Sequence, residues 1–293
     1  ALVTILTDKD PIKIEQVLTD EVYSMLLQNL IPTNRSIMDT LAFALKSFYP
    51  LCGDKLDDYL RELPVDFLLT QDCTEIIDLM RELVDNTDIF PQILLSKKNA
   101  FGNAITRWFQ SNDAIIKATL DLLSSLAMYK QDCLDFSIVM PFCDSSVNPS
   151  IRAIALGILY ATTKEPEFLQ QLILIILNED NFKEAAEIVH DIYMNDDEIF
   201  RDATPDLVQR LIQRIEVGSG ALILATLIDN VSHEQRAEII NAISSLEEIG
   251  SEQCFLLFTI SRKDGVHFEF PLLHNLLKTF CQTTETEAMK SAW

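Results

Sequence analysis

Apolar residues recur at helical spacing along almost the whole chain, and short polar stretches separate one such stripe from the next. In residues 150–162 they fall at Ile151, Ile154, Ala155, Ile158 and Leu159, the i, i+3, i+4, i+7, i+8 pattern of a buried helix face. Residues 113–128 carry a wider stripe, which predicts a helix packed between neighbours on two sides. The sequence therefore predicts many short helices, about eighteen by our count, that cover one another.

The scarcity of glycine supports an all-helical chain. Only 7 of the 293 residues are Gly and 10 are Pro, where average usage would give roughly 20 Gly. Sheet-rich and nucleotide-binding folds use glycine in turns and phosphate loops, and alternation of apolar and polar residues is nearly absent. We expect an all-α fold. Because no Gly/Ser/Pro-rich linker interrupts the chain, we also expect one continuous domain over residues 1–293.

Polar residues mark where the helices begin. Asn148 is expected to cap a helix that has Pro149 at its first position. The run Gly218-Ser219-Gly220 is expected to end one helix before the next begins. Further helices are expected at 19–30, 33–48, 71–84, 131–140, 166–177, 204–215, 219–228 and 232–246, and a loop at 265–270.

The helix openings repeat with a period of about 35 residues. Asp113-Ala-Ile-Ile-Lys117-Ala118 superposes on Asn148-Pro-Ser-Ile-Arg152-Ala153, and Asp180-Asn-Phe-Lys-Glu184-Ala185 follows. Each pair of openings encloses one more expected helix, at 131–140 and at 166–177. Two helices in about 35–40 residues is the period of an α-solenoid.

The segment Asn148-Pro149-Ser150-Ile151-Arg152-Ala153 resembles the turn and second helix of a HEAT repeat. The resemblance is best in 144–161, weaker in 111–128 and 180–193, and elsewhere it rests on helix spacing alone. It implies a right-handed α-solenoid of irregular HEAT/armadillo-like hairpins, clearest over 111–193. Arg152 and Lys117 are then expected to tie adjacent turns together through carboxylates or carbonyls.

The charge balance disfavours two classes of partner. Lys and Arg total 23 against 45 Asp and Glu, a formal net charge of −22. Nucleic acids and anionic membranes are bound through Lys and Arg, so both are disfavoured. A basic protein segment is the natural complement, although net charge alone also keeps a protein in solution. The apolar run at 172–177 is far shorter than the roughly 18 residues of a membrane span, so we expect no transmembrane segment.

The six cysteines have no C-x-x-C spacing, and most lie beside apolar residues. They are typical of the reduced thiols of an intracellular protein, cytoplasmic or nuclear. The chain begins at Ala1 rather than Met and ends in TTETEAMKSAW. Both features are typical of a piece of a longer protein.

Motifs for catalysis or cofactors are missing. His233-Glu234 opens like the zinc motif H-E-x-x-H, but Ala237 stands where the second histidine should be. No G-x-S-x-G, Walker-type or G-x-G-x-x-G sequence occurs. We therefore expect neither enzyme activity, nor a metal, nor a cofactor. Trp108 and Asn112 have the W-x-x-x-N spacing of armadillo importins once only, so we expect Trp108 in a hairpin core and Asn112 in a turn.

One acidic stripe is a candidate binding surface. Glu184, Glu187 and Asp191 lie at i, i+3 and i+7 beside the apolar residues of one helix. The second helix of each HEAT hairpin lines the inner surface, so the resemblance implies that this stripe and Asp121 face a groove for a basic peptide. An ordinary solvated helix face is the alternative.

Together these features predict a non-catalytic scaffold or adaptor that binds a partner protein along an extended surface. The alternative function is a co-chaperone or assembly factor that grips a client protein or another chaperone.

Overall fold

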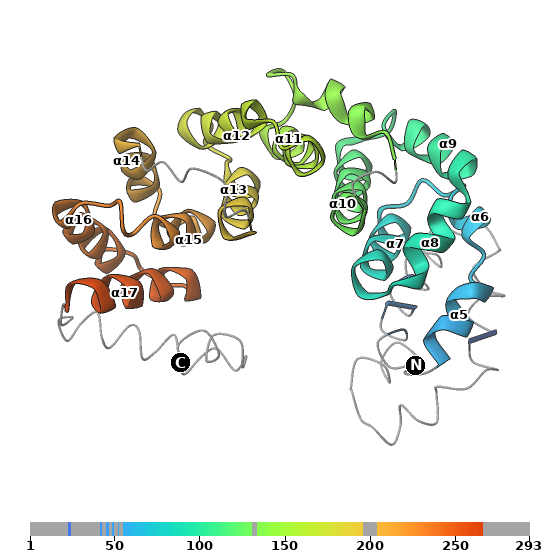
Figure 1. Ribbon diagram of the computed structural model, residues 1–293, viewed down its shortest axis with the longest axis horizontal. Coiled ribbons are helices and arrows are strands. Elements are labelled where there is room, and N and C mark those ends of the chain that lie inside the picture. The colour runs from blue at the N-terminus through green and yellow to red at the C-terminus, as the bar shows by residue number, and fades with distance from the viewer. Residues whose placement is uncertain are drawn as a thin grey trace. The chain divides into compact units, whose positions relative to one another are not determined.

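The computed structural model describes residues 55–130, 134–195 and 204–265, together with Tyr23, Ser24, Ala42, Leu45, Lys46, Tyr49 and Cys52. All regular secondary structure in these residues is helical (Figure 1), which confirms the all-α prediction. The helices are α5 (Leu56–Glu62), α6 (Val65–Leu68), α7 (Thr74–Asn86), α8 (Ile89–Ser96), α9 (Lys98–Trp108), α10 (Asp113–Tyr129), the 3-10 helix η3 (Phe136–Cys143), α11 (Pro149–Thr163), α12 (Pro166–Asn178), α13 (Lys183–Asn195), α14 (Pro205–Gln213), α15 (Gly218–Thr226), α16 (His233–Ser244) and α17 (Ser251–Asp264).

The chain divides into two compact units. Residues 1–141 with 161–163 form the first, and residues 142–160 with 164–293 form the second. The prediction of one continuous domain stays a prediction. The helices expected at 19–30 and 33–48, and the loop expected at 265–270, lie almost wholly outside the described residues.

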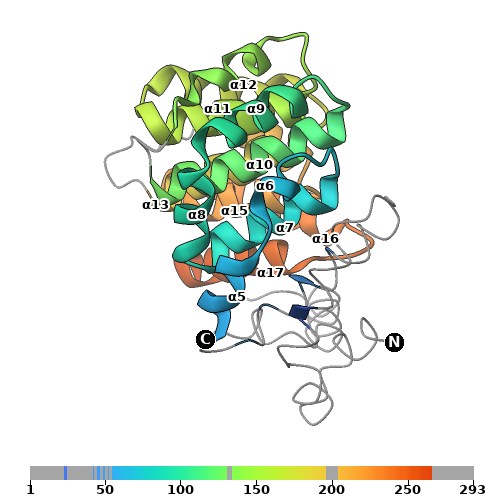
Figure 2. The same ribbon diagram turned by 90° about the vertical axis from the view of Figure 1, so that its right-hand side faces the viewer.

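The first unit is built around the pairing of α7 with α10 (Figure 2). Both helices bury wide apolar stripes, and α8 packs against α5, α7 and α9. The ring of Trp108, at the end of α9, is fully buried, as the sequence predicted. Asn112 caps α10 by accepting a hydrogen bond from the backbone N–H of Ile115.

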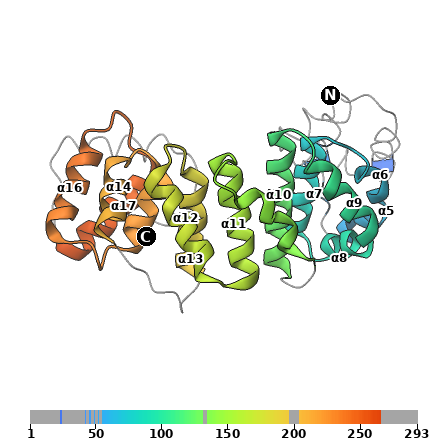
Figure 3. The same ribbon diagram turned by 90° about the horizontal axis from the view of Figure 1, so that it is seen from above.

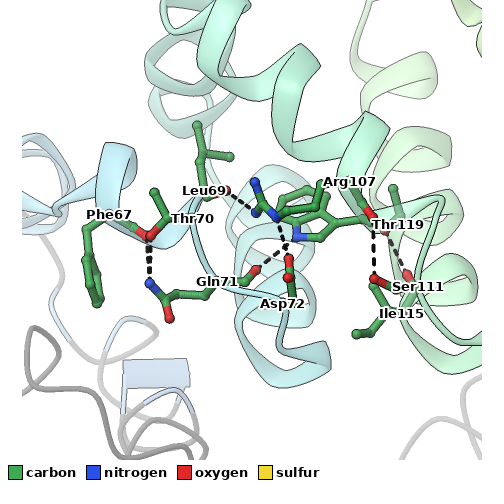
Figure 4. A network of polar contacts seen from close by, with 10 residues as sticks. Phe67, Leu69, Thr70, Gln71, Asp72, Arg107, Ser111, Ile115 and Thr119 are labelled. Carbon is green, nitrogen blue, oxygen red and sulfur yellow. Dashed lines mark hydrogen bonds and ion pairs between the residues drawn. The ribbon is translucent and has the colours of Figure 1, made fainter.

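Polar contacts fix the end of α9 to the segment that leads into α7 (Figure 4). The indole Nε1 of Trp108 donates to the carbonyl of Gln71 at 2.9 Å. The Arg107 guanidinium donates to the Asp72 carboxylate at 2.6 Å and to the carbonyl of Leu69 at 2.7 Å. Because α10 begins directly after this point, these bonds hold the N-terminal ends of α7 and α10 in a fixed relation.

The second unit contains two rows of helices (Figure 1). In one row α14 packs between α12 and α16 (Figure 3), and in the other α15 packs between α13 and α17. Contacts of α12 with α13, α14 with α15 and α16 with α17 join the rows. A single hydrophobic cluster runs through the unit from Ala153 to Ile260.

Polar contacts across the second unit join residues about one predicted repeat apart. Gln253 donates to the carbonyl of Ile215, 38 residues away. Arg214 lies 3.4 Å from Asp180 across 34 residues. Lys263 pairs with Asp229 across the same separation. Arg152, on α11, behaves as predicted: it donates to the Glu179 carboxylate at 2.8 Å and to the carbonyl of Ser145 at 3.0 Å.

Most helix boundaries agree with the sequence prediction, and two segments differ. Gly218-Ser219-Gly220 forms the first turn of α15 instead of a C-cap. A Cβ on Gly218 would lie 3.0 Å from Cδ of Glu252, so a larger residue here requires the Glu252 side chain to move. The segment expected as a helix at 131–140 is described from residue 134 and gives the 3-10 helix η3. Pro141 lies inside η3, where its missing N–H and its ring oppose an α-helix.

Candidate partner-binding site

The predicted acidic stripe lies on α13, in the second unit. Glu187 and Asp191 are exposed, whereas Ala185 and Val189 are buried as predicted. Glu187 lies 3.7 Å from Lys183, one turn earlier on the same helix. The side chain of Asp191 is 75% exposed. Two carboxylates of the stripe are therefore accessible to a partner.

Glu184 has a structural role. Its carboxylate accepts a hydrogen bond from the Ser150 hydroxyl at 3.0 Å, and Asn181 donates to the same hydroxyl oxygen at 3.0 Å. Ser150 is buried in the first turn of α11. The contact therefore ties the beginning of α13 to the beginning of α11.

Asp121 lies in the first unit, on α10. Its carboxylate is 4.0 Å from the Nζ of Lys117, one turn earlier on the same helix. Lys117 was expected to tie adjacent turns, and this ion pair lies within a single helix. The four predicted site residues thus belong to two units, three of them to one helix.

A second candidate surface surrounds the turn between α7 and α8. Three adjoining cavities, of about 340, 400 and 690 Å³, all include Asn86 and Thr87 in their lining. The 400 Å³ cavity lies where α7 and α10 end. We call it the α7–α10 cavity; its lining residues are Val84, Asp85, Asn86, Thr87, Asp88, Ser125, Met128 and Tyr129.

The backbone of this turn is held by its own side chains. The Asn86 amide donates to the carbonyl of Glu82, and the Thr87 hydroxyl donates to the carbonyl of Leu83, both at 2.7 Å. The Thr87 oxygen also accepts from the N–H of Phe90 at 3.3 Å. These bonds satisfy carbonyls at the end of α7 and a donor at the start of α8, so the turn is well fixed.

The described residues offer little reactive chemistry. No group of His, Cys, Asp and Glu side chains among them could hold a metal ion. Burial raises the pKa of the Cys143 and Cys254 thiols to about 11 and that of Cys52 to about 12. These thiols are protonated at neutral pH and are poor nucleophiles. Within the described helices, none has the length and apolar character to cross a membrane.

Sequence reasoning missed the α7–α10 cavity. Asp85 and Asp88 carry no signal of their own in so acidic a chain. Met128 and Tyr129 follow the apolar stripe of α10 directly and look like its continuation. A usable signal was the polar run Asn86-Thr87-Asp88 after a strong apolar stripe, which marks a turn that presents acids at a helix end.

No protein-family model matches the chain, and no curated protein matches its sequence.

Proposed function

We propose that this chain is a non-catalytic protein-interaction module, a scaffold or adaptor that holds a partner protein along a right-handed stack of irregular HEAT/armadillo-like hairpins. The observation that carries the proposal is the packing of the second unit, where α12 pairs with α13, α14 with α15 and α16 with α17, and each helix from α12 to α15 also packs against the helix two positions further along the chain. Repeat proteins have contacts of this neighbouring kind, because each repeat covers the apolar face of the one before.

The polar ties support the same interpretation. Ser219 donates to the carbonyl of Lys183 across 36 residues in the second unit, and Trp108 donates to that of Gln71 across 37 residues in the first. Both separations match the period of the sequence repeat. Neighbouring hairpins connected in this way leave long exposed surfaces, which repeat proteins use for binding.

The charge indicates the partner. A chain with a net charge of −22 favours a protein with a basic segment over nucleic acid. The exposed carboxylates of Glu187 and Asp191 would contribute to such a surface. Four cysteines that the structure describes, Cys52, Cys73, Cys143 and Cys254, are free thiols, which supports a reducing compartment such as the cytoplasm or nucleus.

The experiment is in-cell cross-linking of the chain, followed by reconstitution of the purified chain with the cross-linked protein. We expect a stoichiometric complex in analytical ultracentrifugation that weakens as salt is raised. The variant Glu187→Lys/Asp191→Lys should weaken it, because two attractive charges become repulsive. Glu247→Lys/Glu248→Lys, which makes the same charge change in an exposed turn, is the control. Failure to form any complex at low and moderate salt would contradict the proposal.

A second function, a co-chaperone or assembly factor, has one observation in its favour. Met128, Met140 and Met194 are each more than half exposed. Exposed methionines adapt to differently shaped apolar partners. This function predicts that the chain suppresses aggregation of a heat-unfolded client such as citrate synthase at stoichiometric amounts. Unchanged light scattering by the client would exclude it.

A further inference from the structure

We infer that the α7–α10 cavity binds a basic side chain of the partner protein, preferentially an arginine that has an apolar neighbour in its sequence. This inference rests on the proposed function and adds the place and the chemistry of one contact. It is carried by the electrostatics of two helix ends, by two carboxylates and by an exposed apolar surface.

The two helices that pack together end at this cavity. α7 ends at Asn86 and α10 at Tyr129, and residues from both last turns line the cavity. The C-terminal end of a helix carries roughly half a negative elementary charge. Neither helix has a basic residue in its last turn, and the C-cap residue of α10, Lys130, is not among the residues that line the cavity. Two negative helix ends therefore meet at one cavity.

Two carboxylates add to this negative potential. The side chains of Asp85 and Asp88 are exposed and form no hydrogen bond or ion pair with another described residue. Asp88 is the N-cap residue of α8, yet its side chain makes no capping hydrogen bond. Among the lining residues that the structure describes there is no Lys, Arg or His.

The neighbouring cavities lack this uniform sign. The 690 Å³ cavity includes Arg61 beside Asp57 and Asp88. The 340 Å³ cavity includes the ion pair of Lys46 with Glu82, at 3.0 Å. Charge complementarity to a cation is thus concentrated in the α7–α10 cavity.

The apolar edge of the cavity explains the preference for arginine. Met128 is 73% exposed and Tyr129 is 39% exposed, both at the end of α10. Met128 can cover the aliphatic stem of a long basic side chain, and the Tyr129 ring can lie against a guanidinium. A planar guanidinium also forms two parallel hydrogen bonds to a carboxylate, which an ammonium cannot.

The test uses three synthetic peptides, which carry arginine, glutamine or lysine, and the ε-methyl signals of the seven methionines in the full chain. The arginine and glutamine probes are Ac-Leu-Arg-Leu-NH2 and Ac-Leu-Gln-Leu-NH2, and Met128→Leu assigns the Met128 signal. We expect the arginine peptide to shift the Met128 methyl signal saturably and the glutamine peptide to leave it in place. A lysine peptide should bind more weakly than the arginine peptide.

Variants decide whether the cavity is responsible. Asp85→Asn/Asp88→Asn should raise the Kd of the arginine peptide roughly fivefold, as expected for two exposed charge pairs. The Asp88 side chain makes no capping hydrogen bond, so its replacement by asparagine should preserve α8. Glu247→Gln/Glu248→Gln loses the same charge elsewhere and should bind like the wild type.

Three results would overturn the inference: no shift of the Met128 signal, an equal shift with the glutamine peptide, or an unchanged Kd in the Asp85→Asn/Asp88→Asn variant. The proposed function would survive any of them if the stoichiometric complex with the cross-linked partner still forms. Loss of that complex, with peptide binding intact, would instead contradict the proposed function.

Discussion

Charged side chains that link helices act differently from those that lie on the surface, and Arg152 illustrates the difference. Its side chain is only 10% exposed, and it donates to the Glu179 carboxylate and to the carbonyl of Ser145. Removing the guanidinium leaves both acceptors without this donor. The Glu179 side chain is 36% exposed, so water compensates part of that loss.

Arg152→Met should lower the free energy of unfolding by about 1.5–3 kcal/mol, the range for hydrogen bonds to charged groups. Lys183→Met removes a pair with Glu187 in which both side chains are more than half exposed. That control should cost less than about 0.5 kcal/mol. Urea unfolding followed by circular dichroism measures both, and equal losses would contradict the structural role of Arg152.

Asp264 should make the stability of the folded protein depend on pH, and the direction of that dependence follows from its contacts. Arg236 donates two hydrogen bonds to its carboxylate, at 2.7 and 2.9 Å, and holds the pKa of that carboxyl below its ordinary value. Because this pKa is lower in the folded than in the unfolded state, the carboxylate stabilises the fold at pH values above its ordinary pKa of about 3.9. This stabilisation is lost as the pH falls through the folded-state pKa.

Asp264→Asn should therefore be less stable than the wild type at pH 7, and the difference should shrink below about pH 4. The urea midpoints of both proteins at pH 7, 5 and 3 measure this. A difference that stays constant over this range would show that the carboxylate charge is not responsible.

At the scale of the helices, close packing of a neighbouring helix's side chains decides where glycine is needed. Gly157 on α11 faces α13, and a Cβ at this position would lie 3.0 Å from Cγ2 of Ile188. A small added group requires Ile188 to move, whereas a large one forces the helices apart.

Gly157→Leu should destabilise the protein by about 1–3 kcal/mol, the usual range for overpacking. The double variant Gly157→Leu/Ile188→Ala should recover part of this loss, because the shorter side chain at 188 makes room. Thermal unfolding of the two variants and the wild type measures the effect, and the absence of any recovery would place the strain elsewhere.

The helices themselves were predictable because their signals are local. Asn148, Thr204 and Ser232 cap α11, α14 and α16 with their own side chains, and each stands directly before an apolar stripe. The first turn of α15 was not predictable, because the side chains that lie close to its two glycines, Glu252 and Leu211, belong to other helices.

The candidate site was harder to predict than the fold for the same reason. The stripe on α13 could be found from spacing, but the contact of Glu184 with Ser150 spans 34 residues and depends on how α11 meets α13. The α7–α10 cavity needs the ends of two helices to lie together, and their residues are about 40 positions apart. The polar run Asn86-Thr87-Asp88 marks the turn, but no local pattern shows that the end of α10 lies beside it.

At the scale of the whole molecule, the central claim is that hairpins follow one another in a line and that their exposed surface is the functional part. Within the second unit the two rows of helices already have neighbouring contacts of this kind. A linear stack differs from a compact domain in how its size depends on chain length, because each hairpin adds about 10 Å along the stack.

Small-angle X-ray scattering of the full chain tests this claim most directly. A compact domain of 293 residues has a radius of gyration of about 19 Å. A stack of about nine hairpins spaced roughly 10 Å apart should give a value above about 23 Å, with a pair-distance distribution that extends far beyond its maximum. A value near that of the compact domain, with a symmetrical distribution, would contradict the account.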